Sequence, residues 1–396
     1  RDAVPLGDRS AFSGVIAEEP HATERSQRLT VKLLPPRRGK IEIVTNRFPE
    51  FEYGEVLRAE GLIEKRKGIA ELPTSVFPEI AATGENRGFP PKRFLVNLKH
   101  RLVHQFKRTL PAESAALMAG LTFGVRSDFS EGFRDAMARS GTTHLVALSG
   151  YNIAILVFAV ANSLGRFLSR KTTFYAALAI IFLFVLMVGA QASVVRAAIM
   201  GALILVAREA GRAYNLRNAI TLTAVAMVFF DPAMLAHDVG FQLSFLSLLG
   251  IVYLQPALAH LAFRGKEPRP SFLAWKENAL TTVAAQLAVI PLIVKYFDEF
   301  SLTSFLANVL ILEFVPLTML LGFLLAGIAA AAPAVGIFLG ILANVLLSYH
   351  IAVIKLFARV SIPLPLAANT ILAAGLYIGI LLMIFTLHKR VNATSR

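Results

Sequence analysis

"ARSGTTHLVALSGYN", residues 138–152, marks the point where a charged, proline-rich chain becomes an apolar one. Most of the sequence after it runs in blocks long enough to cross a bilayer core of roughly 30 Å. With 55% hydrophobic and 17% charged residues in a chain of 396, the composition is too apolar for an ordinary soluble domain and indicates a polytopic membrane protein. His144, Ser149 and Asn152 lie at the start of the first apolar block.

Residues 10 to about 72 alternate polar and apolar positions in short stretches separated by glycine and proline. This pattern predicts five short strands in a small all-β barrel of the OB type, over residues 1–75. Such barrels bind single strands through basic grooves and stacking aromatic rings, although surface arginines on a barrel are more often solvated charge. The residues of suitable type are Arg25, Arg28, Arg37, Arg38, Lys40, Phe48, Phe51 and Tyr53.

A linker with amphipathic and interfacial helices is expected over residues 76–140. Its run "PKRFLVNLKHRLVHQFKRTLP", residues 91–111, contains no acid and repeats apolar residues at helical spacing. The run predicts a basic amphipathic helix lying on a surface, with lipid headgroups favoured over nucleic acid as the contact. The cations of this expected surface are Lys92, Arg93, Lys99, Arg101, Lys107 and Arg108.

Residues 141–396 are expected to form an α-helical transmembrane bundle. Its blocks lie near 144–164, 173–191, 192–210, 217–232, 239–261, 278–296, 301–331, 334–356 and 367–387. The block 301–331 is too long for one crossing and has Glu313 and Pro316 at its middle, which favours two short spans or a broken pair. The total is therefore nine or ten spans.

Charges in the connecting loops orient this bundle. Every second loop is basic, as at Arg166 and Arg208, whereas the intervening loops carry acids such as Asp231 and Asp298. The excess of cytoplasmic lysine and arginine places the basic loops inside and the β-domain outside. If the block 301–331 forms two spans, Lys355 and Arg359 also lie inside. We favour this even number of spans.

Polar residues recur inside the expected spans, where each is costly and a functional hypothesis by default. Helix-to-helix hydrogen bonds are the competing explanation, and for Arg196 snorkelling to the interface is another. Taken together, the residues favour a bundle with a hydrated interior and a transport path. A secondary transporter of a small anion would use the same features.

Hydrolysis inside the membrane is a weaker alternative, with His144 as base and Ser149 as nucleophile. Five helical positions separate the two side chains by about 140° around the axis, so one regular helix cannot join them. The chain has no cysteine and no clustered histidines at metal-binding spacing. We therefore predict no catalytic activity, no metal and no cofactor.

Four motifs occur in this order: "LMAGLTFGVRSDFSEGFRDAMARSGTTHLVALSGYNIAIL", "GAQASVVRAAIMGAL", "FFDPAMLAHDVGFQLSFLSLLGI" and "AAQLAVIPLIVKYFDEFSLTSFLANVLI". Over about residues 110–330 the chain resembles the ComEC competence family, the inner-membrane DNA channel of natural transformation. The resemblance implies a multi-pass protein of the bacterial inner membrane that admits single-stranded DNA. It also implies an external DNA receptor, and a cytosolic motor or binding proteins that give direction.

By this resemblance two sets of residues are expected at the DNA path. Arg126 and Asp128 would organise its entrance. The residues expected to line or shape the path are His144, Ser149, Asn152, Gln191, Ser193, Arg196, Gln242, Ser244, Gln286 and Asn308.

The chain also departs from the family pattern. The family usually has "SGLH" where residues 149–152 read "SGYN". Many members carry a metallo-β-lactamase-like nuclease, whose HxHxDH motif is missing here, so the chain is not expected to cut DNA. The family's leading spans are also missing, and the first residue is Arg1, so we expect a fragment of a longer protein.

Overall fold

The computed structural model describes residues 9–23, 25–64, 72–146, 148, 152–153, 155, 165–262, 275–296, 299–301, 303–330, 332–361, 363–365 and 375–379. The chain divides into two compact units. The first comprises residues 1–131, 146–198 and 321–344, and the second comprises residues 132–145, 199–320 and 345–396.

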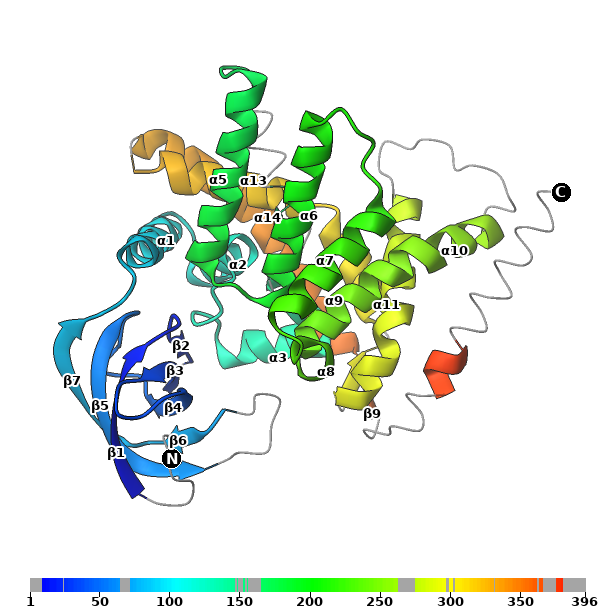
Figure 1. Cartoon of the computed structure of the whole chain (residues 1–396). Coiled ribbons are helices and arrows are strands. Elements are labelled where there is room, and N and C mark those ends of the chain that lie inside the picture. Colours follow the sequence, from blue (N-terminus) through cyan, green and yellow to red (C-terminus); the bar gives the residue numbers. More distant parts are fainter. Residues whose placement is uncertain are drawn as a thin grey trace. The chain divides into compact units, whose positions relative to one another are not determined.

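The first unit begins with a β-barrel (Figure 1). Its strands are β1 (Arg9–Ile16), β2 (His21–Ala22), β3 (Ser26–Leu33), β4 (Lys40–Asn46), β5 (Glu55–Glu64), β6 (Thr74–Val76) and β7 (Glu79–Asn86). The order β1-β3-β4-β6-β5 closes because β5 also pairs with β1, and only the β4–β6 pairing is parallel. With these five strands numbered in sequence the order is 1-2-3-5-4-1, a five-stranded Greek-key barrel of the OB type. The predicted all-β domain is confirmed.

Apolar side chains at every second position of the strands fill the interior of the barrel. On β3, Leu29, Val31 and Leu33 are buried while their neighbours face outward, as the period of two requires. These residues join a core of aliphatic and aromatic side chains that also includes Phe12 and Ile43. Gly14 lies where β1 crosses β3, and a Cβ there would collide with Val31. Glycine is therefore required at this crossing.

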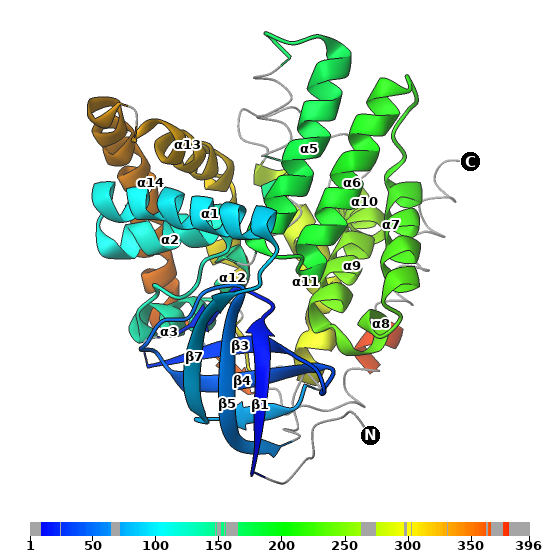
Figure 2. The same ribbon diagram turned by 60° about the vertical axis from the view of Figure 1, so that its left-hand side comes forward.

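Two helices follow the barrel, α1 (Pro90–Thr109) and α2 (Ala112–Phe123), and they lie side by side (Figures 1 and 2). A proline in the first turn suits the start of α1 because no hydrogen bond is lost there. The apolar face of α1 is buried and packs on α2 and on α5 (Arg170–Val188). The rings of Phe106 and Phe123 stack with centroids 6.1 Å apart. This differs from the expected helix lying on a lipid surface, because protein already covers the apolar face.

The remaining elements are mostly helical. They are α3 (Glu131–Arg139), the 3-10 turn η1 (Thr143–Val146), α6 (Ala192–Glu209), α7 (Leu216–Phe230), α8 (Met234–His237), α9 (Val239–Leu249), the π-helical turn η2 (Gly250–Leu254), α10 (Gln255–Ala262), α11 (Trp275–Tyr296), α12 (Ser304–Leu312), α13 (Val315–Ile328) and α14 (Pro333–Val360). Two short strands, β8 (Glu299–Ser301) and β9 (Pro363–Pro365), pair with each other.

Four helical segments among the described residues are long and apolar enough to cross a membrane: Arg170–Val188, Val239–His260, Ala279–Tyr296 and Pro333–Val360. The bent pair α12 and α13 makes a fifth if it counts as one span. With 15 residues, α7 is short, and α6 carries three charged residues. Much of the expected spans 144–164 and 367–387 lies outside the described residues. A helical membrane protein is thus confirmed, while nine or ten spans stay a prediction.

The block 301–331 is one bent segment. Its two helices turn by only 51° at the break, and Pro316 lies in the first turn of α13, where proline starts a helix readily. The hydroxyl of Tyr349 on α14 donates to the carbonyl of Leu310 on α12 at 3.1 Å, so these helices pack together. The β8–β9 pair brings the start of α12 to the end of α14. Of the two expected alternatives, two short spans or a broken pair, the structure fits the broken pair.

Candidate functional site

The segment that follows α3 leaves regular helical structure in the first unit. Leu148 is not helical, and the carbonyls of Val146 and Leu148 accept side-chain hydrogen bonds. The donors are Arg126 Nε at 3.4 Å and Ser193 Oγ at 2.8 Å. Irregular backbone at membrane depth persists only where protein or a water-filled cavity satisfies its polar groups. A predicted entrance residue, Arg126, and a predicted path residue, Ser193, thus satisfy these two carbonyls. Ser149 lies outside the described residues.

Asn152 is 4% exposed and fastens the same stretch to α2. Its Nδ2 donates to the carbonyl of Leu121 at 3.0 Å, in the last turn of α2, where carbonyls lack helical partners. The close approach depends on Gly120, because a Cβ there would lie 2.9 Å from Val146 Cγ1. Asn152, the last residue of "SGYN", therefore has a hydrogen-bond partner in α2.

Two further predicted path residues lie at the start of α6. Gln191 is exposed just before the helix, and its carbonyl accepts from the amides of Val194 and Val195 at 3.0 and 2.9 Å. Arg196, one turn further on, is only 7% exposed. An arginine that snorkels would extend its guanidinium to the interface, so this burial favours an interior role.

In the second unit, Asn308 on α12 is 1% exposed, and its Oδ1 has no hydrogen-bond partner among the described residues. Gln242 has partners, since its Nε2 donates to the carbonyls of Leu235 and Ala236 at 2.9 and 3.1 Å. Ser244 and Gln286 are half-buried on α9 and α11, which pack together. His144 is exposed on η1. The path residues therefore come from several elements and differ in exposure, and their shared role in a DNA path stays a prediction.

Sequence reasoning missed His350 on α14. It is 1% exposed, and both ring nitrogens lack a hydrogen-bond partner in the described part of the chain. A lone histidine inside a long apolar helix was the available signal. His350 and Asn308 belong to the packed pair α12 and α14. Buried polar atoms without protein partners are typical sites for water.

A groove of about 290 Å³ lies outside the expected spans of the first unit, between barrel loops, α1 and residues 125–128. At its edge the carboxylate of Glu19 accepts hydrogen bonds from Lys99 Nζ and, at 2.8 Å, from His100 Nε2. Burial alone would raise the pKa of Glu19, but the hydrogen bond from His100 and the charge of Lys99 outweigh it. They hold the pKa at about 2 instead of the ordinary 4.5.

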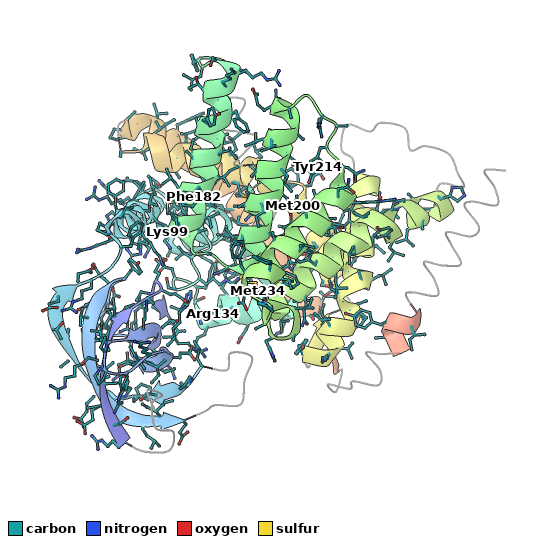
Figure 3. The ribbon with its side chains drawn as sticks, viewed as in Figure 1. Lys99, Arg134, Phe182, Met200, Tyr214 and Met234 are labelled. Atoms are coloured by element: carbon teal, nitrogen blue, oxygen red, sulfur yellow. The ribbon has the colours of Figure 1, made fainter. Side chains whose placement is uncertain are left out.

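The expected basic surface of α1 needs correction. Lys99 (Figure 3) is 3% exposed and bound to Glu19, so neither lipid nor DNA can reach it. Lys92 donates to the carbonyl of Ala17 at 3.2 Å, and burial lowers its pKa. Lys107 pairs with Asp128 at 2.8 Å, which joins a predicted surface residue to a predicted entrance residue. The other cations of the set, Arg93, Arg101 and Arg108, are exposed.

The barrel aromatics also differ from a stacking platform. Phe51 packs in the barrel core, and Tyr53 is 9% exposed with Lys92 Nζ 4.3 Å from its ring centroid. Phe48, in contrast, is 70% exposed with the guanidinium of Arg47 5.5 Å from its ring centroid. Of the three expected aromatic contacts, Phe48 alone has an accessible face.

Comparison with known proteins gives two matches. The family model described as "Competence protein" matches residues 121–390, more than half of the chain. "ComE operon protein 3" of Bacillus subtilis (strain 168) is 26% identical over 223 residues. That alignment covers 56% of this chain and 27% of the relative, so the chain spans only about a quarter of the relative's length. No solved structure matches.

Proposed function

The chain belongs to the competence protein family, and on that basis we propose that its helical region conducts single-stranded DNA into the cytoplasm during natural transformation. The name of the Bacillus relative supports a role in competence, and the apolar helices support a place in the membrane. An external DNA receptor and a cytosolic motor or binding proteins complete the proposed system.

The observation that carries this proposal is the polar character of buried positions on membrane-capable helices. Asn308 and His350 keep polar atoms unpartnered among the described residues, and the carbonyls of the buried Val146 and Leu148 accept hydrogen bonds from the side chains of Arg126 and Ser193. A dry structural bundle would avoid both features, because each costs free energy in an apolar medium. Weak, multiple hydrogen-bonding sites are what conduction requires, since a tight site would trap the strand.

The proposed orientation keeps the barrel outside and makes α12 and α13 together one bent inward crossing. α14 then returns outward, and its last turns lie at the end of the second unit where β8 pairs with β9. Gly141, which follows α3, supports this placement, because a Cβ there would collide with Ser304 at the start of α12. In this orientation Lys355 and Arg359 lie on the outer side, whereas two separate spans in the block 301–331 would bring them inside.

The proposal is tested by import of fluorescent DNA in a deletion strain complemented with the full-length gene. Asn308→Leu replaces a buried amide by an apolar side chain with the same branching. We expect import to fall by roughly tenfold, which corresponds to about 1.4 kcal/mol at one step of the path. Asn218→Leu, the same substitution at an exposed position of α7, is the matched control and should import normally.

Membrane fractions must contain equal amounts of each variant. Normal import by the Asn308→Leu strain at normal protein level would contradict the proposed path. Import that stays normal while uptake of a small inorganic anion falls would indicate a transporter of small anions instead.

A further inference from the structure

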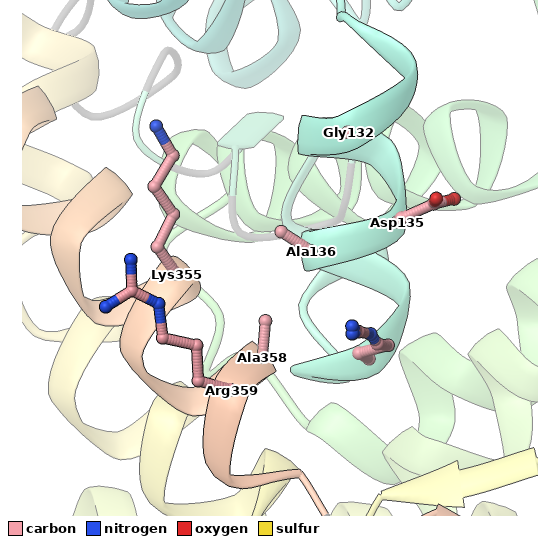
Figure 4. Close-up of a pocket in the computed structure, with 7 residues that line it drawn as sticks. Gly132, Asp135, Ala136, Lys355, Ala358 and Arg359 are labelled. Atoms are coloured by element: carbon pink, nitrogen blue, oxygen red, sulfur yellow. The ribbon is translucent and has the colours of Figure 1, made fainter.

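A second hollow lies in the second unit, between α3 and the last turns of α14. Its volume is about 310 Å³, and Gly132, Asp135, Ala136, Arg139, Lys355, Ala358 and Arg359 line it. Ala136 and Ala358 face the space between the two helices, and their small side chains leave it open (Figure 4). Asp135 points away from Lys355 and Arg359. Arg139, Lys355 and Arg359 therefore supply three cations to the lining, and the carboxylate of Asp135 is directed away from the two cations of α14.

The cations of α14 continue an exposed apolar stripe. Phe338, Ile341 and Val345 are 60% exposed or more, and the stripe runs on at steps of three or four through Ser348 and Ala352 to Lys355 and Arg359. Residues at these steps share one helix face. Within α14 the stripe is apolar over most of its length and cationic at its end, because Lys355 and Arg359 are the helix's lysine and arginine residues.

The depth of the cations follows from helix geometry. At about 1.5 Å per residue, Lys355 lies about 33 Å and Arg359 about 39 Å along the helix from Pro333. A hydrocarbon core of roughly 30 Å therefore ends near Lys355, at the level of lipid phosphates. The short, amphipathic α3, which buries Phe133 and Met137, borders the same hollow. The hollow thus lies at the boundary between lipid and water.

We propose that this hollow binds the phosphate headgroup of an anionic phospholipid, with acyl chains along the exposed stripe of α14. Charge complementarity favours a phosphate, and the continuous apolar stripe favours a ligand that carries hydrocarbon chains. DNA carries phosphates but no hydrocarbon chains, so it would not contact the apolar stripe in this way. The site does not depend on DNA being the conducted substrate, and the orientation proposed above assigns it to the outer leaflet.

The test measures binding of phosphatidylglycerol and phosphatidylcholine to the purified, delipidated full chain by native mass spectrometry. The wild-type protein should retain phosphatidylglycerol preferentially. The double variant Lys355→Gln/Arg359→Gln should bind it more weakly by roughly tenfold or more, since each cation near a membrane surface contributes about fivefold. The control, Lys32→Gln/Arg58→Gln, removes the same charges from exposed barrel positions and should bind as the wild type does.

A second variant, Ala136→Leu, fills the hollow and leaves every cation in place. This variant should also bind phosphatidylglycerol more weakly than the wild type does. It tests the proposal if the double variant does not fold. Unchanged lipid preference in the folded variants would overturn the proposal. The proposal would also be overturned if the variants kept phosphatidylglycerol and lost a short single-stranded oligonucleotide, because the hollow would then be a DNA phosphate site.

Discussion

The barrel and the helical region treat a buried amide in opposite ways. In the barrel, Gln27 is 2% exposed, and its Nε2 donates to the carbonyls of Asn46, Arg47 and Pro49 at 2.8, 3.0 and 2.6 Å. In the second unit, Asn308 is equally buried, and its Oδ1 has no partner among the described residues. An amide with all its hydrogen bonds stabilises one arrangement of its surroundings. A buried amide without a partner lowers the free energy of unfolding, so its presence suggests a role in function.

The largest expected loss of stability comes from the dry barrel core. Ile43→Ala leaves a cavity at a fully buried position and should cost about 2–5 kcal/mol. Thermal unfolding of the detergent-solubilised full chain, with limited proteolysis of the barrel, measures the loss. A change below about 1 kcal/mol would mean that the barrel interior is looser than its alternating strands indicate.

The contact between Glu19 and α1 is expected to depend on pH. Because the folded pKa of about 2 lies below the ordinary 4.5, this contact contributes stability above pH 4.5 and loses it as pH falls toward 2. The contribution at neutral pH is up to about 3 kcal/mol. Glu19→Gln should therefore lower the melting temperature at pH 7, and the difference from wild type should shrink in acid. A difference that is constant between pH 7 and pH 3 would contradict the ion pair.

The two amides give a matched pair of variants. Gln27→Leu removes the donor for three carbonyls and should cost about 1–3 kcal/mol. Asn308→Leu removes a group without a described partner, so stability should stay within about 1 kcal/mol of wild type or rise. Thermal unfolding of both variants in the same detergent tests the contrast. Equal destabilisation would show that Asn308 has a structural partner and would remove the contrast.

The smallest effect is expected at the barrel surface. Phe48→Ala removes a ring that is 70% exposed and should change stability by less than about 0.5 kcal/mol. Thermal unfolding provides this check. A larger loss would show that Phe48 packs against another part of the chain.

Sequence patterns predicted the barrel well because a strand shows its buried face every second residue. For α1 the charges were misleading, although Lys99 falls on the apolar face at helical steps from Leu95, Val103 and Phe106. The position was visible in the sequence, whereas its partner Glu19, 80 residues away, was not. Likewise, Glu313 and Pro316 indicated the break between α12 and α13, but not its angle of 51°.

For the candidate site, the sequence identified residue types but not their partners. Ser193 and Asn152 were chosen as polar groups inside spans, and their hydrogen bonds to backbone carbonyls depend on the folded path of residues 146–153. His350, which follows Ser348 and Tyr349 in the chain, was not among the predicted path residues. Its neighbour in space is α12, which no local pattern indicates.

Transport in a purified system tests the central claim most directly. Liposomes containing the full chain enclose a single-strand-binding protein as a trap, and nuclease outside removes DNA that has not entered. We predict that labelled single strands become protected, that duplex of equal length does not, and that Asn308→Leu protects far less. Protection no greater than in protein-free liposomes would contradict the claim that this helical region conducts single-stranded DNA.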